Sequence, residues 1–259
     1  MSVLVVSGTG TGVGKTVVSA AVVALALARG ASVAYVKPAQ TGVPDEVAGG
    51  AVEAPAEPAD VDVVCALAGL PRQHAVELAR FPDPLSPAAA ARRAGRPAVS
   101  LRSVATRVGE LAERYRLVVV EGAGGLLVRY DEDGGTLADL ARLVGAPVLV
   151  VAAAGLGTLN HTALTLEALA HRGLDLAGLV IGSWPADPDL AARCNVADLE
   201  MLAARPLAGA LESLEGAPAP LDAASFSYLA RSGLAPALGG RFDPAEFRTT
   251  WAPRAKDAP

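Results

Sequence analysis

The chain has 259 residues, enough for one large domain or two small ones, and α/β folds of this length commonly form one. Apolar residues make up 52% of the sequence, which suits a well-buried parallel sheet. The net charge of −5, with no basic block, argues against nucleic acid as a partner. Cys65 and Cys194 lie far apart and form no metal-binding pattern, which favours reduced thiols.

We expect a cytoplasmic protein without a membrane partner. The N-terminal apolar run is interrupted by glycines after a few residues, unlike a secretory leader. The longest apolar helical run, residues 17–28, is shorter than the roughly 20 residues that a membrane-spanning helix needs.

The first predicted strand, residues 3–7, leads into a glycine-rich turn at residues 8–14, then Lys15, Thr16 and an apolar helix. This pattern binds nucleoside triphosphates, because loop N–H groups and the helix N-terminus face the phosphates. In such a loop the lysine reaches the β- and γ-phosphate oxygens and the threonine hydroxyl ligates Mg²⁺.

The loop has an unusual length and lacks one lysine. The glycine usually found five residues before Gly14 is Thr9 here, and Gly8 lies one residue earlier. Partitioning and arsenite-pump ATPases carry a second lysine five residues before Lys15, where this chain has Gly10. The loop therefore argues against that class of ATPase.

Further short apolar runs alternate with helical patterns. Strands are predicted at residues 32–36, 117–120, 147–152 and 176–181, and helices at 16–29, 101–115, 137–144 and 162–171. This alternation predicts a single-domain P-loop NTPase-like α/β fold, with a mostly parallel sheet flanked by helices. We assign residues 1–240 to this domain and 241–259 to a C-terminal tail. Residues 43–59, 216–220 and those after Thr250 are expected to be mobile surface segments.

Functional residues in such a sheet follow the carboxyl ends of the strands. Lys37, in Lys-Pro-Ala-Gln-Thr-Gly, is either a rim lysine with its ammonium in solvent or an anion ligand, and the nearby phosphate loop favours the ligand. Glu121, in Glu-Gly-Ala-Gly-Gly, is either a solvated turn residue or a Mg²⁺ ligand, and its place after an apolar strand favours the ligand.

The strand at residues 147–152 leads into Gly-Leu-Gly-Thr-Leu-Asn-His-Thr. Asn160 or Thr162 caps the predicted helix, with Thr158 and Asn160 in the turn before it. The N–H groups at this helix start suit a carboxylate, but ordinary capping explains the same residues equally well.

Four blocks, residues 8–16, 37–42, 120–128 and 156–169, together resemble the dethiobiotin synthetase family, in order and spacing, from residue 3 to about residue 210. The resemblance implies the penultimate step of biotin synthesis. CO₂ joins 7,8-diaminopelargonic acid at the expense of ATP, with Mg²⁺. One amine becomes a carbamate, the carbamate takes the γ-phosphoryl group, and the second amine closes the ureido ring and releases phosphate.

The resemblance also assigns site residues by motif position. Lys37 would stabilise the carbamate, with Lys15 beside it, and the substrate carboxylate would cross a two-fold axis to the partner's helix start, which implies a homodimer. The Mg²⁺ ligands would be Thr16, Asp60 and Glu121, with Asp62 as the alternative to Asp60. Substrate contacts would be Thr11, Lys37, Thr41, Gly157, Thr158, Leu159 and Asn160. Nucleotide contacts would be Gly12, Val13, Gly14, Lys15, Thr16, Val17, Asp60, Glu121, Gly122, Ala123, Gly124, Gly182, Ser183, Leu211, Glu212 and Ser213.

This chain departs from the family pattern in two places. Gly10 and Gly12 replace an Asp and a Glu of the loop, which leaves the ligating set intact. Gly182-Ser183 replaces an Asn-Asp that reads the adenine edge, and neither residue can pair bidentately with a base as an amide does. Triphosphate binding is therefore expected, while base specificity stays open.

Two other classes of protein share part of this pattern. A partitioning-type switch ATPase would act by nucleotide-dependent dimerisation. That class has a lysine where this chain has Gly10, and a basic or amphipathic membrane-binding tail is also missing. An amide-forming ligase of the cobyrinate amidase type usually carries a glutaminase domain with a nucleophilic cysteine, for which we expect this chain to be too short.

Overall fold

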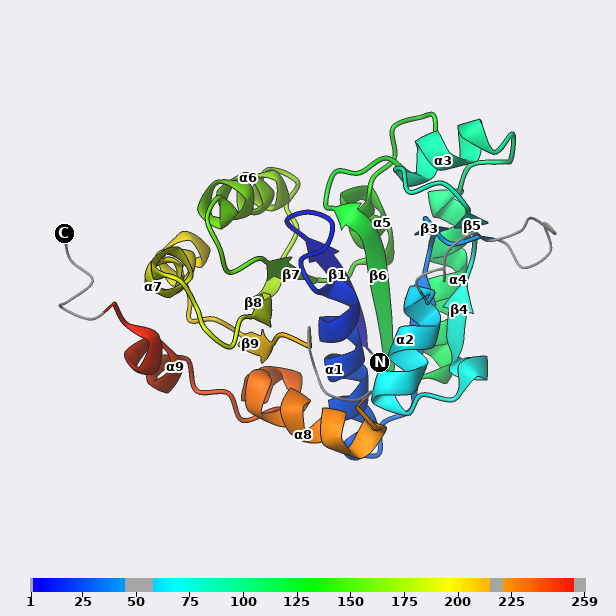
Figure 1. Ribbon diagram of the computed structural model, residues 1–259. Coiled ribbons are helices and arrows are strands. Elements are labelled where there is room, and N and C mark those ends of the chain that lie inside the picture. The colour runs from blue at the N-terminus through cyan, green and yellow to red at the C-terminus, as the bar shows by residue number, and fades with distance from the viewer. Residues whose placement is uncertain (1, 45–57, 215–220, 254–259) are drawn as a thin grey trace.

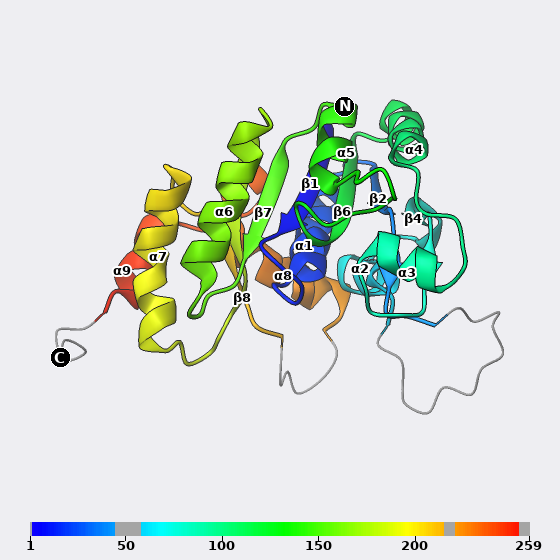
Figure 2. The same cartoon turned by 90° about the horizontal axis from the view of Figure 1, so that it is seen from above.

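A computed structural model describes residues 2–44, 58–214 and 221–253, with a seven-stranded sheet at the centre (Figures 1 and 2). All strand pairs in this sheet are parallel. In spatial order the strands are β4 (Ala75–Glu77), β2 (Val33–Lys37), β6 (Leu117–Gly125), β1 (Ser2–Gly8), β7 (Val148–Ala152), β8 (Leu176–Trp184) and β9 (Gly209–Glu212).

Helices cover both faces of the sheet, so the strands are apolar along almost their whole length. One face is covered by α1 (Lys15–Ala28), α2 (Asp60–Ala68) and α8 (Ala223–Gly233). The other is covered by α4 (Leu101–Arg114), α5 (Leu137–Val144), α6 (Thr158–His171) and α7 (Leu190–Ala203). The smaller elements are β3 (Gln40–Thr41), β5 (Arg80–Phe81), α3 (Pro87–Arg93), α9 (Pro244–Trp251) and the 3₁₀ turns Arg72–His74 and Pro236–Leu238.

Strand β1 illustrates how the two-residue period of a strand divides the core. Leu4 and Val6 point to the face of α1, α2 and α8, whereas Val5 points to the opposite face. The same alternation decides which strand-end side chains share a face with the phosphate loop.

No helix among the described residues is long and apolar enough to cross a bilayer.

The predicted α/β fold class is confirmed, and the differences lie at element ends. The strands predicted at 117–120 and 176–181 continue to Gly125 and Trp184, and Lys37 is the last residue of β2. Helix α6 begins at Thr158, four residues before the predicted start, so the expectation that Asn160 or Thr162 caps it is wrong. Its N-cap is Gly157, at φ 92°, where glycine meets no steric penalty.

Several segments went unassigned in the sequence. The edge strands β4 and β9, which are short, were not predicted, and neither were the helices α2, α3, α7, α8 and α9. Most of 43–59, all of 216–220 and the residues after 253 lie outside the described part of the chain, so their predicted mobility stays a prediction.

Helix α9 lies within the range assigned to the tail and packs beside α7 (Figure 1). The indole of Trp184, at the end of β8, contacts the ring of Phe247 with centroids 4.9 Å apart and that of Trp251 at 5.6 Å. Offset and edge-on contacts between aromatic rings are favourable beyond their buried area. Helix α9 is thus anchored to the end of a sheet strand.

Gly182 lets strand β8 approach the phosphate loop closely. A β-carbon built on Gly182 would lie 2.1 Å from the carbonyl oxygen of Val13 and 2.5 Å from Cγ1 of Val151. On the loop side, a β-carbon on Gly14 would lie 2.5 Å from the carbonyl oxygen of Gly182. Neither position has room for a side chain, so the absence of an asparagine at 182 follows from packing in this structure.

We expect Gly182→Ala to destabilise the protein and weaken nucleotide binding together. The methyl group must displace the backbone at Val13, and overpacking of this kind costs about 1–3 kcal/mol. Thermal unfolding and calorimetry with a nucleoside triphosphate measure the two effects. Gly109→Ala in α4 is the control, because nothing lies within 4 Å of its β-carbon. Wild-type stability and affinity for Gly182→Ala would contradict the close approach.

Candidate active site

Strand pairing brings Lys37 beside Glu121. Val36 of β2 pairs with Val120 of β6, so the next residues along each strand, Lys37 and Glu121, lie next to one another at the carboxyl edge. Strand β6 also pairs with β1, which places Glu121 opposite Val6, just before the phosphate loop. The neighbouring strands β2, β6 and β1 therefore bring an ammonium, a carboxylate and the loop together at the carboxyl edge.

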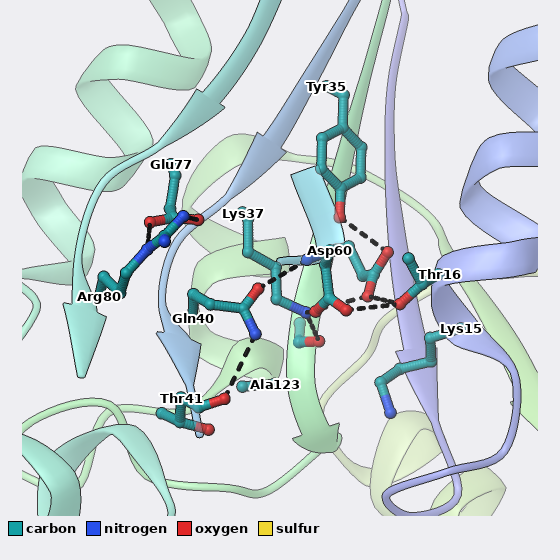
Figure 3. A network of polar contacts seen from close by, with 12 residues as sticks. Lys15, Thr16, Tyr35, Lys37, Gln40, Thr41, Asp60, Glu77, Arg80 and Ala123 are labelled. Atoms are coloured by element: carbon teal, nitrogen blue, oxygen red, sulfur yellow. Dashed lines mark hydrogen bonds and ion pairs between the residues drawn. The ribbon is translucent and has the colours of Figure 1, made fainter. Parts of the chain in front are cut away.

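A cluster of four side chains forms there (Figure 3). Lys37 Nζ lies 2.9 Å from Glu121 Oε1 and also pairs with the carboxylate of Asp60, the first residue of α2. The hydroxyl oxygen of Thr16 lies 2.9 Å from Glu121 Oε1 and 3.0 Å from Asp60 Oδ1. Burial opposes the charge on Lys37, but the two carboxylates outweigh it and raise the lysine pKa above its usual value.

Uncharged side chains hold this cluster from behind. Tyr35, two residues before Lys37 on the same face of β2, donates a hydrogen bond to Glu121 Oε2 at 2.9 Å. The side-chain oxygen of Gln40 accepts from the backbone N–H of Asp60 at 3.0 Å, and so fixes the start of α2. The hydroxyl of Tyr130 accepts from the N–H of Ala123 at 2.7 Å.

Lys15 faces the phosphate loop that precedes it. Its ammonium donates to the carbonyl oxygen of Gly10 at 2.8 Å. Burial and the nearby charge of Lys37 lower the Lys15 pKa to about 8. Helix α1 starts after Gly14, at φ 91°, without a side-chain cap. Its first N–H groups and two ammonium groups thus lie at one end of the helix, as phosphate binding requires.

The oxygen donors suit a magnesium ion. The hydroxyl of Thr16 is within 3.0 Å of one carboxylate oxygen each from Asp60 and Glu121, so three hard oxygen ligands converge. Among the described residues no group of three or more His, Cys, Asp and Glu side chains could hold a metal. Mg²⁺ commonly takes only one or two carboxylates and fills its other positions with phosphate oxygens and water.

The structure separates the two aspartates considered for the metal. Asp60 belongs to the cluster, whereas Asp62 forms an ion pair with Arg72 at 3.4 Å, and both of those side chains are about half exposed.

A cavity of about 800 Å³ opens beside the cluster. Leu85 and the start of α3 form its far wall and were missed in the sequence, where nothing marks them as polar or catalytic. Gln40 and Tyr35 were also missed; the only signal for Tyr35 is its place two residues before Lys37, on the same face of the strand. The expected site residues that line the cavity are Thr11, Gly12, Gly14, Lys15, Thr16, Val17, Lys37, Thr41, Asp60, Glu121, Ala123 and Gly124.

The residues expected to meet the substrate carboxylate lie outside this cavity. Gly157, Thr158, Leu159 and Asn160 form the first turn of α6 and its N-cap, and do not line the cavity within one chain. Thr158 donates to the carbonyl oxygen of Ala153 at 2.7 Å, and Asn195 donates to those of Ala154 and Gly155. These bonds fix the helix start, on which Asn160 is exposed.

The residues expected near the base also lie away from the cavity. The carbonyl oxygen of Trp184 accepts from the N–H of Ser213 at 2.8 Å and joins the ends of β8 and β9. The side chain of Leu211 is fully buried against the layer of α1, α2 and α8, while Glu212 is exposed. Ser183 follows Gly182 in β8. Val13 in the phosphate loop and Gly122 near the end of β6 do not line the cavity either.

Comparison with solved structures shows the same fold in nucleotide-dependent ATPases. A ParA family ATPase from Chlorobium tepidum matches with a TM-score of 0.52 and 13% identity, over 88% of this chain and 97% of the other. The cell division ATPase MinD of Pyrococcus furiosus matches with a TM-score of 0.51 and 19% identity, over 88% and 96%. At these identities the likeness concerns the fold alone.

Sequence comparison is more specific. A family model described as an AAA domain matches residues 2–220. The ATP-dependent dethiobiotin synthetase BioD of Frankia casuarinae is 62% identical over 97% of this chain and 99% of its own length. BioD of Parafrankia sp. is 60% identical over 97% and 100%, and BioD of Streptomyces avermitilis 54% over 98% and 100%. With the phosphate loop, Lys37 and Glu121 gathered at one edge of the sheet, these relatives show that the chain belongs to the ATP-dependent dethiobiotin synthetase family.

Proposed function

We propose that this chain makes dethiobiotin from 7,8-diaminopelargonic acid, CO₂ and ATP. The observation that carries the proposal is the place of Lys37: a buried, positively charged ammonium touching the same carboxylate as the phosphate-loop threonine. An enzyme that only hydrolyses ATP needs a positioned water molecule as nucleophile. A carbamate nucleophile is an anion, so an enzyme that uses one needs a cation beside the γ-phosphate. The names of the relatives agree with this reading.

The proposed reaction has three steps. One amine of the substrate adds to CO₂ and loses a proton, which forms a carbamate. A carbamate oxygen then attacks the γ-phosphorus of ATP and ADP leaves, giving a carbamic–phosphoric mixed anhydride. The second amine attacks the anhydride carbonyl, the ureido ring closes and phosphate departs with the carbamate oxygen.

The residues of this chain would act mainly by holding charge in place. Lys37 would bind the carbamate and, later, the phosphorylated oxygen, and Lys15 would lie on the β- and γ-phosphates. Thr11 and Thr41, which line the cavity beside Lys37, would contact the diamine end. Mg²⁺, held by Thr16, Asp60 and Glu121, would neutralise charge on the transferred phosphoryl group. Such positioning and electrostatic stabilisation account for most phosphoryl-transfer catalysis.

The proposal includes a homodimer with the site at its interface. The start of α6 lies outside the cavity of its own chain, so a carboxylate that reaches it would come from a substrate bound to the partner. Leu156, before this helix, is 93% exposed and Leu164, within it, is 58% exposed. Exposed leucines beside a functional helix start are consistent with a surface covered by a second chain.

A switch ATPase of the partitioning type is the alternative, and its fold is the same. The two functions differ in what ATP cleavage requires. We expect phosphate release from this protein to need both the diamine and bicarbonate, with either one alone leaving only a background rate. Coupled detection of phosphate, with each substrate omitted in turn, measures this. Steady ATP hydrolysis without the diamine would exclude the ligase.

Lys37→Met should separate carbamate binding from nucleotide binding. The substitution keeps an apolar stem of similar length but removes the charge, so nucleotide affinity should stay within a few-fold. Loss of a charged contact should weaken diamine binding in the presence of bicarbonate by about 2 kcal/mol, or about thirtyfold. Calorimetry with each ligand measures both. Lys15→Met is the mirror control, expected to lose nucleotide affinity first. If Lys37→Met loses only nucleotide affinity, its assigned role is wrong.

Mixing two inactive variants tests the shared site. If Asn160 serves the substrate on the partner chain, a heterodimer of Asn160→Ala and Lys15→Met contains one intact site and one with both defects. Random exchange should then restore about a quarter of wild-type turnover. Native mass spectrometry establishes that heterodimers form. Heterodimers without activity would place Asn160 in the site of its own subunit.

Base specificity should be weak. Gly182 faces the phosphate loop and has no side chain. An asparagine amide there would lose a hydrogen bond when the base changes and so would discriminate between bases, but this chain has no such amide at that position. We expect CTP, GTP and UTP to support turnover with kcat/KM within about tenfold of ATP, a spread below about 1.4 kcal/mol. Steady-state kinetics with the four triphosphates decide this. A preference for ATP above a hundredfold would show that the base is read elsewhere, for instance by backbone near Leu211–Ser213.

A further inference from the structure

Tyr35 is a buried residue to which the proposed reaction gives no role. Its side chain is 0% exposed, and its hydroxyl donates to Glu121 Oε2 at 2.9 Å (Figure 3). Tyr35 and Lys37 lie two residues apart on β2 and therefore point to the same face of the sheet. The pairing of Tyr35 with Val119 brings the ring alongside β6, two residues before Glu121.

This hydrogen bond makes the two oxygens of Glu121 unequal. Oε2 is held by the tyrosine, while Oε1 lies 2.9 Å from Thr16 Oγ1 and 2.9 Å from Lys37 Nζ. Glu121 is 0% exposed, so solvent does not replace a missing partner at Oε2. Because Tyr35 holds one oxygen and Thr16 and Lys37 hold the other, the carboxylate of Glu121 cannot rotate freely about its terminal bond.

The packing of the tyrosine ring fixes the direction of its hydroxyl. The ring fills the core formed with Val119 and the layer of α1, α2 and α8, which fixes where the hydroxyl points.

We propose that Tyr35 is a positioning residue for Glu121, holding Oε2 so that Oε1 alone faces Thr16 and the cation that accompanies the nucleotide. This inference rests on the proposed role of Glu121 in binding Mg²⁺. It adds that the geometry of the ligand is set by a hydroxyl in the core, since residues that orient a ligand commonly change metal affinity by about tenfold or more.

The test is a double-mutant cycle read by nucleotide binding. Calorimetry gives the affinity for ATP with Mg²⁺ and, in the presence of a chelator, without it, for wild type, Tyr35→Phe, Glu121→Gln and the double variant. We expect Tyr35→Phe to leave the affinity without Mg²⁺ within twofold and to cut the gain from Mg²⁺ by about tenfold. In the Glu121→Gln background, the same tyrosine change should have no further effect, because it acts through the carboxylate.

Tyr115→Phe is the matched control. It removes the same hydroxyl from a half-buried tyrosine that follows α4, before the amino end of β6, where its ring lies 5.3 Å from that of His74. This variant should keep the wild-type gain from Mg²⁺. A loss equal to that of Tyr35→Phe would overturn the assignment.

The outcomes separate this inference from the proposed function. If Glu121→Gln loses the gain from Mg²⁺ and Tyr35→Phe retains it, the positioning role is wrong and Glu121 stands. If neither variant changes it, Glu121 is not a metal ligand and both statements fall.

Folding of the variants is also informative. Removing the hydroxyl leaves a buried carboxylate oxygen unpaired, which is costly. If Tyr35→Phe fails to fold and the double variant folds, the hydroxyl serves the Glu121 charge, as proposed. If both fail to fold, Tyr35 is a core residue and the inference is overturned.

Discussion

A buried ammonium between two carboxylates organises this site. Lys37 and Glu121 are almost inaccessible to solvent, and charges are costly to bury unless each has a close partner. Asp60, Glu121 and the carbonyl oxygen of Gly122 supply those partners for Lys37. The same carboxylates contact Thr16, so the ion cluster ties β2, β6 and the start of α1 to the start of α2.

This arrangement has a consequence for catalysis. Lys37 balances the charge of Asp60 and Glu121, the residues proposed to hold the metal, and it also lines the cavity. Lys15, with a pKa lowered to about 8 by burial and by Lys37, interacts with its own loop instead of a carboxylate. The two lysines thus have different electrostatic surroundings, which is why we propose different ligands for them.

Five of the seven sheet strands and four of the helices, α1, α4, α5 and α6, could be predicted because their signals are local. Continuous apolar runs gave β2, β6, β7 and β8, and glycines after α1 and α5 ended those helices where expected. Helix α6 was placed too late because Gly157 starts it, and a glycine N-cap is less distinctive than the Asn160 and Thr162 that follow.

The site residues divide by the same reasoning. Lys37 and Glu121 were predicted because a charge at the end of an apolar strand is conspicuous, whereas Tyr35 and Gln40 look like ordinary strand and loop residues in sequence. Gly182 was read as a lost base contact, but its reason is packing against Val13, which depends on a contact between segments more than 160 residues apart. Contacts of this kind become visible only in three dimensions.

The source of the oxygen in the released phosphate tests the central claim most directly. If a carbamate oxygen attacks ATP and leaves with phosphate at ring closure, turnover with ¹⁸O-labelled bicarbonate in ordinary water transfers one labelled oxygen to each phosphate released. Mass spectrometry of the phosphate and of the cyclic product, sampled before bicarbonate exchanges with water, gives the answer. Unlabelled phosphate from labelled bicarbonate, or label appearing only from ¹⁸O-water, would mean that water attacks ATP, as in a switch ATPase, and would contradict the account.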